Sequence, residues 1–157
     1  MRRKIIGVIG AGADVEPQHL EFAYSIGRLL AENGAILICG GLGGIMETAC
    51  HGACDAGGIT VGVLPSENIA TANQFVAIPV ATGLGQARNK IIVSTAQALI
   101  AISGKYGTLS EIAFALDSGK RVYGLDTWDI EGIIKVETPE MAVRLALSEG
   151  PWSPEEP

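Results

Sequence analysis

The chain has 157 residues, of which 48% are hydrophobic and 18% are charged, and its formal net charge is −6 at pH 7. This composition excludes a disordered chain, and the negative charge argues against a general nucleic-acid partner, because such binding needs a basic surface that neutralises phosphates. The length favours one folded domain, which we place at residues 1–150, followed by a flexible tail with three prolines at residues 151–157.

The sequence shows no apolar run that approaches the roughly 20 residues needed to cross a bilayer, so we expect no membrane partner. The three cysteines, Cys39, Cys50 and Cys54, are an odd and sparse set, which favours a reducing compartment. We therefore predict a cytoplasmic protein. Cys50 and Cys54 are spaced for one helical face, but no fourth ligand is close in sequence. We interpret these two cysteines as small core residues and predict no metal site.

Apolar segments alternate with helical patterns along the whole chain. We predict strands at 4–9, 35–39, 59–64, 75–78, 98–102 and 120–125. Helices are expected at 17–32, 44–56, 83–96 and 108–118, and a last helix begins after the cap Thr138, with Pro139 in its first position. Strands that are apolar throughout and alternate with helices are typical of a parallel sheet. The fold class is therefore α/β, a single-domain doubly wound parallel sheet with helices on both faces.

A glycine-rich turn follows the predicted strand at 35–39. Four glycines in five residues, Gly40, Gly41, Gly43 and Gly44, let the backbone come close to a ligand. Because ligands of parallel sheets bind at the carboxyl ends of strands, we predict that these glycines bind a ligand. Tight packing of the strand against the next helix is the alternative.

A second turn of the same kind, Ser103-Gly104-Lys105-Tyr106-Gly107-Thr108, follows the predicted strand at 98–102. The free N–H groups and the dipole of a helix start favour a phosphate or carboxylate. Both turns lie at carboxyl ends of strands, so we expect them to face each other across one pocket. An earlier turn, Gly10-Ala11-Gly12, does not predict a dinucleotide site, because Val15 stands where the third glycine of that motif belongs.

Two charged residues have competing interpretations. Arg88, in the first turns of the helix predicted at 83–96, can pair with a phosphate through two N–H groups or form a surface salt bridge. Glu111 completes a capping box with Thr108, in which its side chain reaches back to the Thr108 backbone. A carboxylate beside a phosphate site can also stabilise a sugar oxocarbenium ion.

Together these segments resemble the LONELY GUY-like family, also labelled lysine decarboxylase-like, within the nucleotide-binding Rossmann group. The glycine turn before Ile45-Met46 is similar to the family's turn before Gly-Leu-Met, and Arg88 with Lys90 is similar to its Arg-Lys pair. The segment from Ser103 to Glu111 is similar to its Pro-Gly-Gly-x-Gly-Thr-x-x-Glu signature. The resemblance covers roughly residues 4–125 and implies a Rossmann-like fold, with Met46, Ser103 and Lys105 added to the ligand-binding set. It does not support a lysine decarboxylase.

Within that family, Ser103 replaces the signature proline and Lys105 replaces its second glycine. These departures, and the short chain, resemble the molybdenum-cofactor-carrier branch more than the cytokinin-activating enzymes. The resemblance also implies a homo-oligomer, a dimer or a tetramer.

Two functions follow from the resemblance, and both involve a small phosphorylated ligand and no required cofactor. In a nucleoside 5'-monophosphate phosphoribohydrolase, the amides of Gly104, Gly107 and Thr108 hold the phosphate, and Arg88 and Glu111 are catalytic. In a non-catalytic carrier, the molybdenum cofactor is the bound ligand, and Lys105, Arg88 and Lys90 offer charge to its phosphate or molybdate oxygens.

Overall fold

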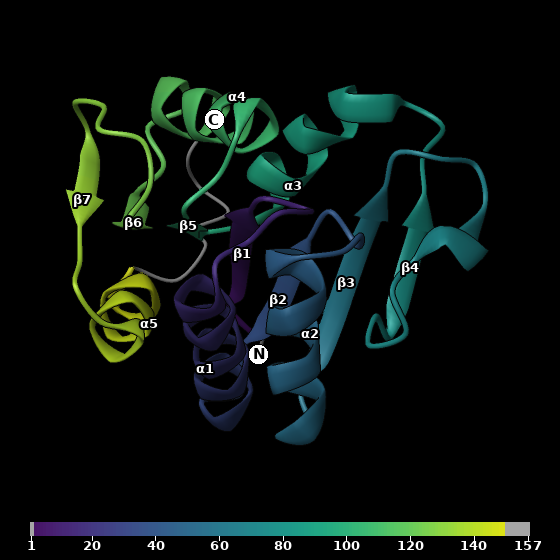
Figure 1. The fold of residues 1–157 in the computed structure, drawn as a ribbon, viewed down its shortest axis with the longest axis horizontal. Helices are drawn as coiled ribbons and strands as arrows, with labels where there is room; N and C mark the ends of the chain where they lie inside the picture. The colour runs from purple at the N-terminus through teal and green to yellow at the C-terminus, as the bar shows by residue number, and fades with distance from the viewer. Residues whose placement is uncertain (1, 150–157) are drawn as a thin grey trace.

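The computed structural model describes residues 2–149, so the tail predicted at 151–157 lies outside the described residues. Within this range the strands form one parallel sheet in the order β4-β3-β2-β1-β5-β6-β7 (Figure 1). The strands are β1 (Ile5–Gly10), β2 (Ile36–Cys39), β3 (Ile59–Leu64), β4 (Ile78–Ala81), β5 (Ala98–Ile102), β6 (Val122–Leu125) and β7 (Ile133–Lys135). The predicted α/β class and parallel sheet are confirmed.

Helices cover both faces of the sheet (Figure 1). The helices α1 (Pro17–Glu32), α2 (Ile45–Asp55) and α5 (Pro139–Ser148) pack on one face, and α3 (Asn89–Thr95) and α4 (Tyr106–Asp117) pack on the other. Two short 3₁₀ turns, η1 (Ile69–Thr71) and η2 (Gly85–Arg88), complete the fold. The predicted cap of α5 is confirmed, since the Thr138 hydroxyl accepts from the Met141 amide at 3.2 Å. None of the helices in residues 2–149 is both long and apolar enough to cross a membrane.

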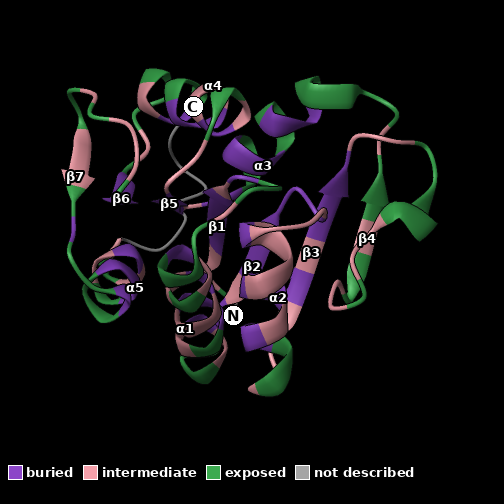
Figure 2. Ribbon diagram, viewed as in Figure 1, coloured by how far each residue is buried: buried purple, intermediate pink, exposed green. Residues whose placement is uncertain are grey.

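The centre of the sheet is buried (Figure 2). The chain runs outward from β1 to β4 and then returns to the other side of β1 as β5, every residue of which is buried. The direction of strand order therefore reverses between β1 and β5. In sheets of this kind, ligands bind outside the carboxyl ends of the strands at that reversal.

At the edges of the sheet, one predicted strand has wrong boundaries and one strand was not predicted. The strand predicted at 75–78 begins only at Ile78, because the Thr60 hydroxyl donates to the Phe75 carbonyl at 2.7 Å and accepts from the Ala77 amide at 2.8 Å, in place of ladder hydrogen bonds. Pro79 lies inside β4, which is tolerated because β4 is an edge strand. At the other edge the structure adds β7, a strand of 3 residues that was not predicted.

Two predicted helices also differ. The segment predicted as one helix at 83–96 is the 3₁₀ turn η2 followed by α3. The helix α4 begins at Tyr106 rather than Thr108, with Lys105 in extended conformation immediately before it. This shift of two residues determines which groups of the Ser103–Thr108 turn are free to meet a ligand.

Candidate functional site

A cavity of about 210 Å³ lies where the strand order reverses, at the carboxyl ends of β1, β2 and β5. It is lined by Gly10, Ala11, Gly12, Gly40, Leu42, Met46, Gln86, Arg88, Asn89, Lys105, Gly107, Thr108 and Glu111. The structure therefore brings together the two predicted glycine turns, Arg88 and Glu111. No group of three or more His, Cys, Asp or Glu side chains arranged for a metal ion occurs within residues 2–149.

The turn after β2 is closed by the turn after β1. The Ile45 amide, at the start of α2, donates to the Ala11 carbonyl at 3.0 Å. Gly44 has φ +62°, and a Cβ there would lie 2.3 Å from the same carbonyl oxygen, so only glycine fits. From this turn Gly40, Leu42 and Met46 line the cavity, whereas Gly41, Gly43 and Gly44 do not. Ligand binding by those three glycines stays a prediction.

The turn after β5 is open. The N–H groups of Tyr106, Gly107 and Thr108 have no hydrogen-bond acceptor within the described chain, as the first turn of a helix leaves them. Lys105, Gly107 and Thr108 line the cavity, whereas Ser103 and Gly104 do not. Gly104 has φ +120°, and a Cβ there would lie 2.5 Å from the Thr108 side chain. Gly104 is therefore required by the close approach of Thr108.

Lys105 connects this turn with the one after β1. Its Nζ lies 3.2 Å from the Asp14 Oδ2, and the two side chains are 65% and 86% exposed. An exposed ion pair of this kind contributes at most about 1 kcal/mol, so an anion in the cavity can compete with Asp14 for the lysine. The Lys105 carbonyl accepts from the Trp128 indole at 3.2 Å, which fixes the backbone immediately before α4.

Arg88 is buried, with 4% of its surface exposed. Its Nε donates to the Val63 carbonyl at 2.8 Å, its Nη1 donates to Gln86 and Asn89 at 2.7 and 2.6 Å, and its Nη2 donates to the Gly40 carbonyl at 3.4 Å. Four of the five guanidinium N–H groups therefore have protein acceptors. The salt-bridge alternative is wrong, because Arg88 is not on the surface, and one N–H group remains for a ligand.

Glu111 is also buried, with 8% of its surface exposed. The predicted capping box is wrong: Thr108 lies inside α4 rather than before it, and the carboxyl of Glu111 makes no hydrogen bond within residues 2–149. Burial raises the pKa of Glu111 to about 8, although the nearby Arg88 guanidinium opposes that rise. The same burial lowers the pKa of Arg88, and Glu111 partly restores it. The environment of Glu111 therefore favours the neutral form of its carboxyl.

Two buried thiols, of Cys39 and Cys50, lie near Arg88 and Glu111. The Sγ atoms of Cys39 and Cys50 are 3.5 Å apart, and the Gly41 amide donates to Cys39 at 3.4 Å. The hydrogen bond with Cys50 lowers the pKa of the Cys39 thiol, and the same contact together with burial raises the pKa of Cys50. Cys39 and Cys50 are core residues, but Cys54 is exposed, so the core prediction is wrong for Cys54.

Sequence reasoning missed several lining residues. Gly10, Ala11 and Gly12 were considered only as part of a dinucleotide motif, although their position at a strand end next to the reversal was a usable signal. Gln86 and Asn89 flank Arg88 and orient its guanidinium. Asn89 in turn donates to the Ser110 hydroxyl at 3.1 Å. No residue type or spacing distinguishes these amide side chains from ordinary surface residues.

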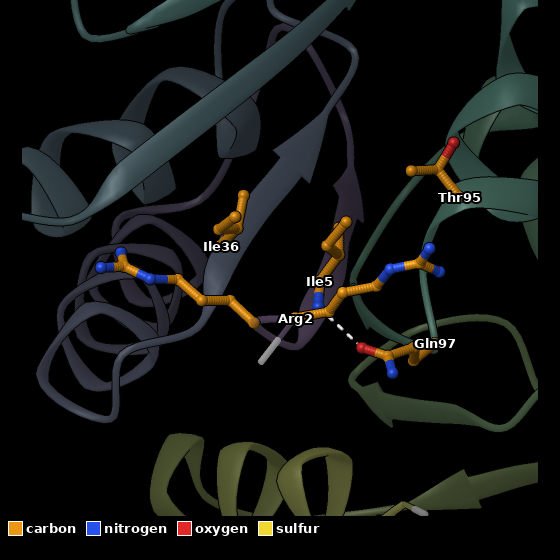
Figure 3. Close-up of a pocket in the computed structure, with 6 residues that line it drawn as sticks. Arg2, Ile5, Ile36, Thr95 and Gln97 are labelled. Atoms are coloured by element: carbon orange, nitrogen blue, oxygen red, sulfur yellow. Dashed lines mark hydrogen bonds between the residues drawn. The ribbon is translucent and has the colours of Figure 1, made fainter. Parts of the chain in front are cut away.

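A second cavity, of about 360 Å³, lies at the amino ends of β1 and β2, at the opposite end of these strands from the candidate site (Figure 3). Ile5 and Ile36, which are paired across β1 and β2, lie side by side there. The Gln97 side chain accepts from the Ile5 amide at 2.8 Å, and Thr95 and two arginines complete the lining. This cavity is lined by none of the predicted site residues and by no helix N-terminus. We therefore place the candidate site at the carboxyl ends of the strands.

Known proteins are similar to this chain in sequence and in fold. The chain is 48% identical over 149 residues to an uncharacterized protein of Archaeoglobus fulgidus, covering 94% of this chain and 97% of that one. It is 39% identical to the molybdenum cofactor binding protein of Rippkaea orientalis, with a TM-score of 0.89 and coverage of 94% and 98%. It is 36% identical to the Moco carrier protein of Chlamydomonas reinhardtii, with a TM-score of 0.83 and coverage of 94% and 99%.

The resemblance to the short molybdenum-cofactor-carrier branch of Rossmann-like proteins is confirmed by these structural matches. The sequence model of the SLOG cluster4 family matches residues 3–150, nearly the whole chain. The chain therefore belongs to the SLOG cluster4 family.

Proposed function

We propose that the chain is a carrier that binds a phosphorylated pterin, the molybdenum cofactor or a close chemical relative, without converting it. The observation that carries this proposal is the open start of α4, where Gly107 and Thr108 reach the cavity and their amides have no acceptor in the described chain. Free amides at a helix N-terminus bind a phosphate. The ammonium of Lys105 adds a positive charge at the same turn.

The lining residues fit the chemistry of this ligand. The amides of Gly107 and Thr108 and the Lys105 ammonium suit phosphate oxygens. Gly10, Gly12 and Gly40 present backbone rather than side chain to the cavity, which leaves a flat ring system access to peptide groups. The two solved relatives described above are a molybdenum cofactor binding protein and a Moco carrier protein, which supports a pterin over other phosphate esters.

The residues assigned to hydrolysis are poorly suited to it. A carboxylate that stabilises a ribosyl cation must carry negative charge, whereas burial raises the pKa of Glu111 to about 8 and favours its neutral form in the empty site. Four of the five Arg88 N–H groups already have protein acceptors. These two observations favour a carrier over the phosphoribohydrolase.

Anaerobic calorimetry tests the proposal, with molybdenum cofactor isolated from a molybdenum enzyme as one probe and AMP as the other. We expect saturable binding of the cofactor and a longer half-life of the bound cofactor in air than of the free cofactor. Chromatography of the AMP mixture is expected to show no adenine. Release of adenine and ribose 5-phosphate, or failure of the cofactor to bind, contradicts the proposal.

A Gly107→Val variant locates the ligand. A Cβ at Gly107 causes no steric clash, since the nearest atom to it is the Gln86 Nε2 at 3.8 Å, an ordinary van der Waals contact. The variant is therefore expected to fold and to lose at least tenfold in cofactor affinity. Unchanged affinity would place the ligand elsewhere. A Lys135→Gln variant is the surface control, because Lys135 forms an exposed ion pair with Asp129 away from the cavity.

A further inference from the structure

Glu111 is a buried carboxyl that lines the cavity and makes no hydrogen bond within the described chain. The Thr108 hydroxyl, which also lines the cavity, likewise makes none, but it is uncharged. A buried carboxylate is stable only when donors or cations satisfy it. The nearest cation, Arg88, directs its Nε and Nη1 toward Val63, Gln86 and Asn89. The Glu111 carboxyl thus lines the cavity without the hydrogen-bond donors that a buried carboxylate requires.

The charged and titratable groups around Glu111 come from three segments. Arg88 faces it from η2, and its positive charge favours the carboxylate. Cys39, at the end of β2, interacts with both Glu111 and Arg88 and would add negative charge if ionised. Lys105, before α4, lines the same cavity but pairs with Asp14. Burial outweighs the effect of Arg88, so the empty site already favours the neutral carboxyl.

An anionic ligand strengthens that preference. A phosphate bound at the start of α4 would share a cavity of about 210 Å³ with Glu111, and two negative charges at such short range disfavour each other. A neutral carboxyl, in contrast, has an O–H group that can donate to an oxygen of the ligand. The ligand oxygen then satisfies the side chain that the protein leaves without a partner.

We propose that Glu111 binds the ligand as a neutral carboxylic acid, donating a hydrogen bond to a ligand oxygen, so that the site takes up its anion together with a proton. This inference rests on the proposed function. It specifies a ligand with a phosphate at one end and an acceptor oxygen, such as a carbonyl or an oxo group, within reach of Glu111. It also makes Glu111 a specificity-determining residue rather than a nucleophile or a base.

The test compares the wild-type chain, Glu111→Gln and Glu47→Gln as binders of isolated molybdenum cofactor between pH 6 and 9.5. Glutamine retains an N–H donor without a titrating proton, and Glu47 lies in the first turn of α2 but does not line the cavity. Calorimetry in two buffers with different ionisation heats counts the protons taken up on binding. Because the ligand's own protons are common to all three chains, the difference between the wild-type chain and Glu111→Gln isolates residue 111.

We expect the Kd of the wild-type chain, divided by the Kd of Glu111→Gln at the same pH, to rise roughly tenfold per pH unit above pH 8. This ratio should be about 30-fold larger at pH 9.5 than at pH 6. At pH 8 the wild-type chain should take up about half a proton more than Glu111→Gln. Glu47→Gln should follow the wild-type profile.

Two results separate this inference from the proposed function. If the wild-type chain binds the cofactor at pH 6 but its proton uptake equals that of Glu111→Gln, Glu111 is not a proton donor and the carrier proposal stands. Glu111 is likewise not a donor if affinity rises with pH, because the carboxylate then accepts from a ligand N–H group. If the wild-type chain does not bind the cofactor at pH 6, the carrier proposal and this inference both fall.

Discussion

The turns after β2 and β5 look alike in the sequence but differ in what they leave free. The turn after β2 lies against the turn after β1, where the Ala11 carbonyl accepts from Ile45 and abuts Gly44. No backbone carbonyl abuts the start of the helix after β5, and a Cβ at Gly107 would meet only the Gln86 side chain, at 3.8 Å. The turn after β2 is therefore packed against a neighbouring turn, although Gly40 still lines the cavity, whereas the turn after β5 leaves the start of its helix accessible from the cavity.

The two turns do not differ in being rich in glycine. They differ in whether the first backbone amide of the following helix has a hydrogen-bond acceptor in the protein. Within residues 2–149, the first amide of α2 has a protein acceptor and the next two, of Met46 and Glu47, have none, whereas none of the first three amides of α4 has an acceptor. Since buried N–H groups in proteins are nearly always bonded, the open turn is the part of the site where a ligand's oxygens gain most. The variants below test that contrast.

The largest effect is expected from Glu111→Gln at high pH. The folded pKa of Glu111, about 8, exceeds its ordinary value of 4.5, so the folded chain binds a proton there that the unfolded chain has already lost between those two pH values. The wild-type free energy of unfolding should therefore fall as pH rises from about 4.5 to 8 and stay level above, by on the order of 5 kcal/mol at most. Glu111→Gln should lack this fall. Chemical unfolding at pH 5 and pH 9 measures it, and equal pH profiles would show that Glu111 is ionised in the empty site.

Arg88→Met should have the next largest effect, because Arg88 joins both turns. Its Nη2 donates to the Gly40 carbonyl of the turn after β2, and its Nη1 donates to Asn89, which in turn donates to the Gly107 carbonyl of the turn after β5 at 3.5 Å. The substitution leaves the Gly40 and Val63 carbonyls without this donor, and we expect a loss of about 4 kcal/mol in the free energy of unfolding. Arg28→Met, which removes an exposed ion pair with Glu32, should change it by less than about 1 kcal/mol. Similar losses in the two variants would contradict a joining role for Arg88.

Gly44→Ala and Gly107→Ala compare the two turns directly and should differ in sign. At Gly44 the positive φ and the Ala11 carbonyl at 2.3 Å predict a destabilisation of about 3 kcal/mol. At Gly107 the methyl group meets nothing closer than 3.8 Å in a helix, and alanine should stabilise by roughly 0.5–1 kcal/mol. Guanidinium unfolding midpoints check both values. A destabilised Gly107→Ala would mean that the turn after β5 is as closed as its counterpart.

The smallest effect concerns Lys105→Gln. Its exposed ion pair with Asp14 predicts a change of less than about 1 kcal/mol in stability, but removal of a positive charge from the cavity should weaken cofactor binding several-fold, more so at low salt. Lys135→Gln removes a comparably exposed ion pair, with Asp129, and should leave the affinity unchanged. Titrations at two salt concentrations distinguish the two lysines, and equal affinities would remove Lys105 from the site.

The central fold could be predicted from the sequence because its signals are local. Apolar runs such as Ala98–Ile102 become fully buried strands, and Thr138 with Pro139 marks the start of α5. The start of α4 was misplaced because Thr108 and Glu111 have the spacing of a capping box, whereas the backbone at Lys105 already precedes the helix. The strand at the β4 edge was displaced because a side chain, Thr60, takes over hydrogen bonds that a strand would make. At the other edge, β7 was missed because it has only 3 residues.

The candidate site was predictable in position but not in chemistry. Glycines at strand ends locate it, since that rule depends only on topology. The burial of Arg88 and Glu111, and the hydrogen bonds that occupy most of the Arg88 guanidinium, depend on residues more than 20 positions away such as Val63 and Gly40. Interactions at that sequence separation leave no periodic signal, so the burial that raises the pKa of Glu111 emerges only from the packed structure.

The central position of β1 has a consequence for synthesis on the ribosome. β1 pairs on one side with β2 and on the other with β5, so its second neighbour ends at Ile102. At about 5–20 residues per second, the first strand waits on the order of ten seconds with one edge unpaired. Lys4, immediately before β1, donates to the carbonyl of Leu147 in the last turn of α5 and to that of Glu149 immediately after it. One edge of this apolar strand thus stays unpaired until Ile102 has been synthesised, and unpaired strand edges make a nascent chain prone to aggregation during that interval.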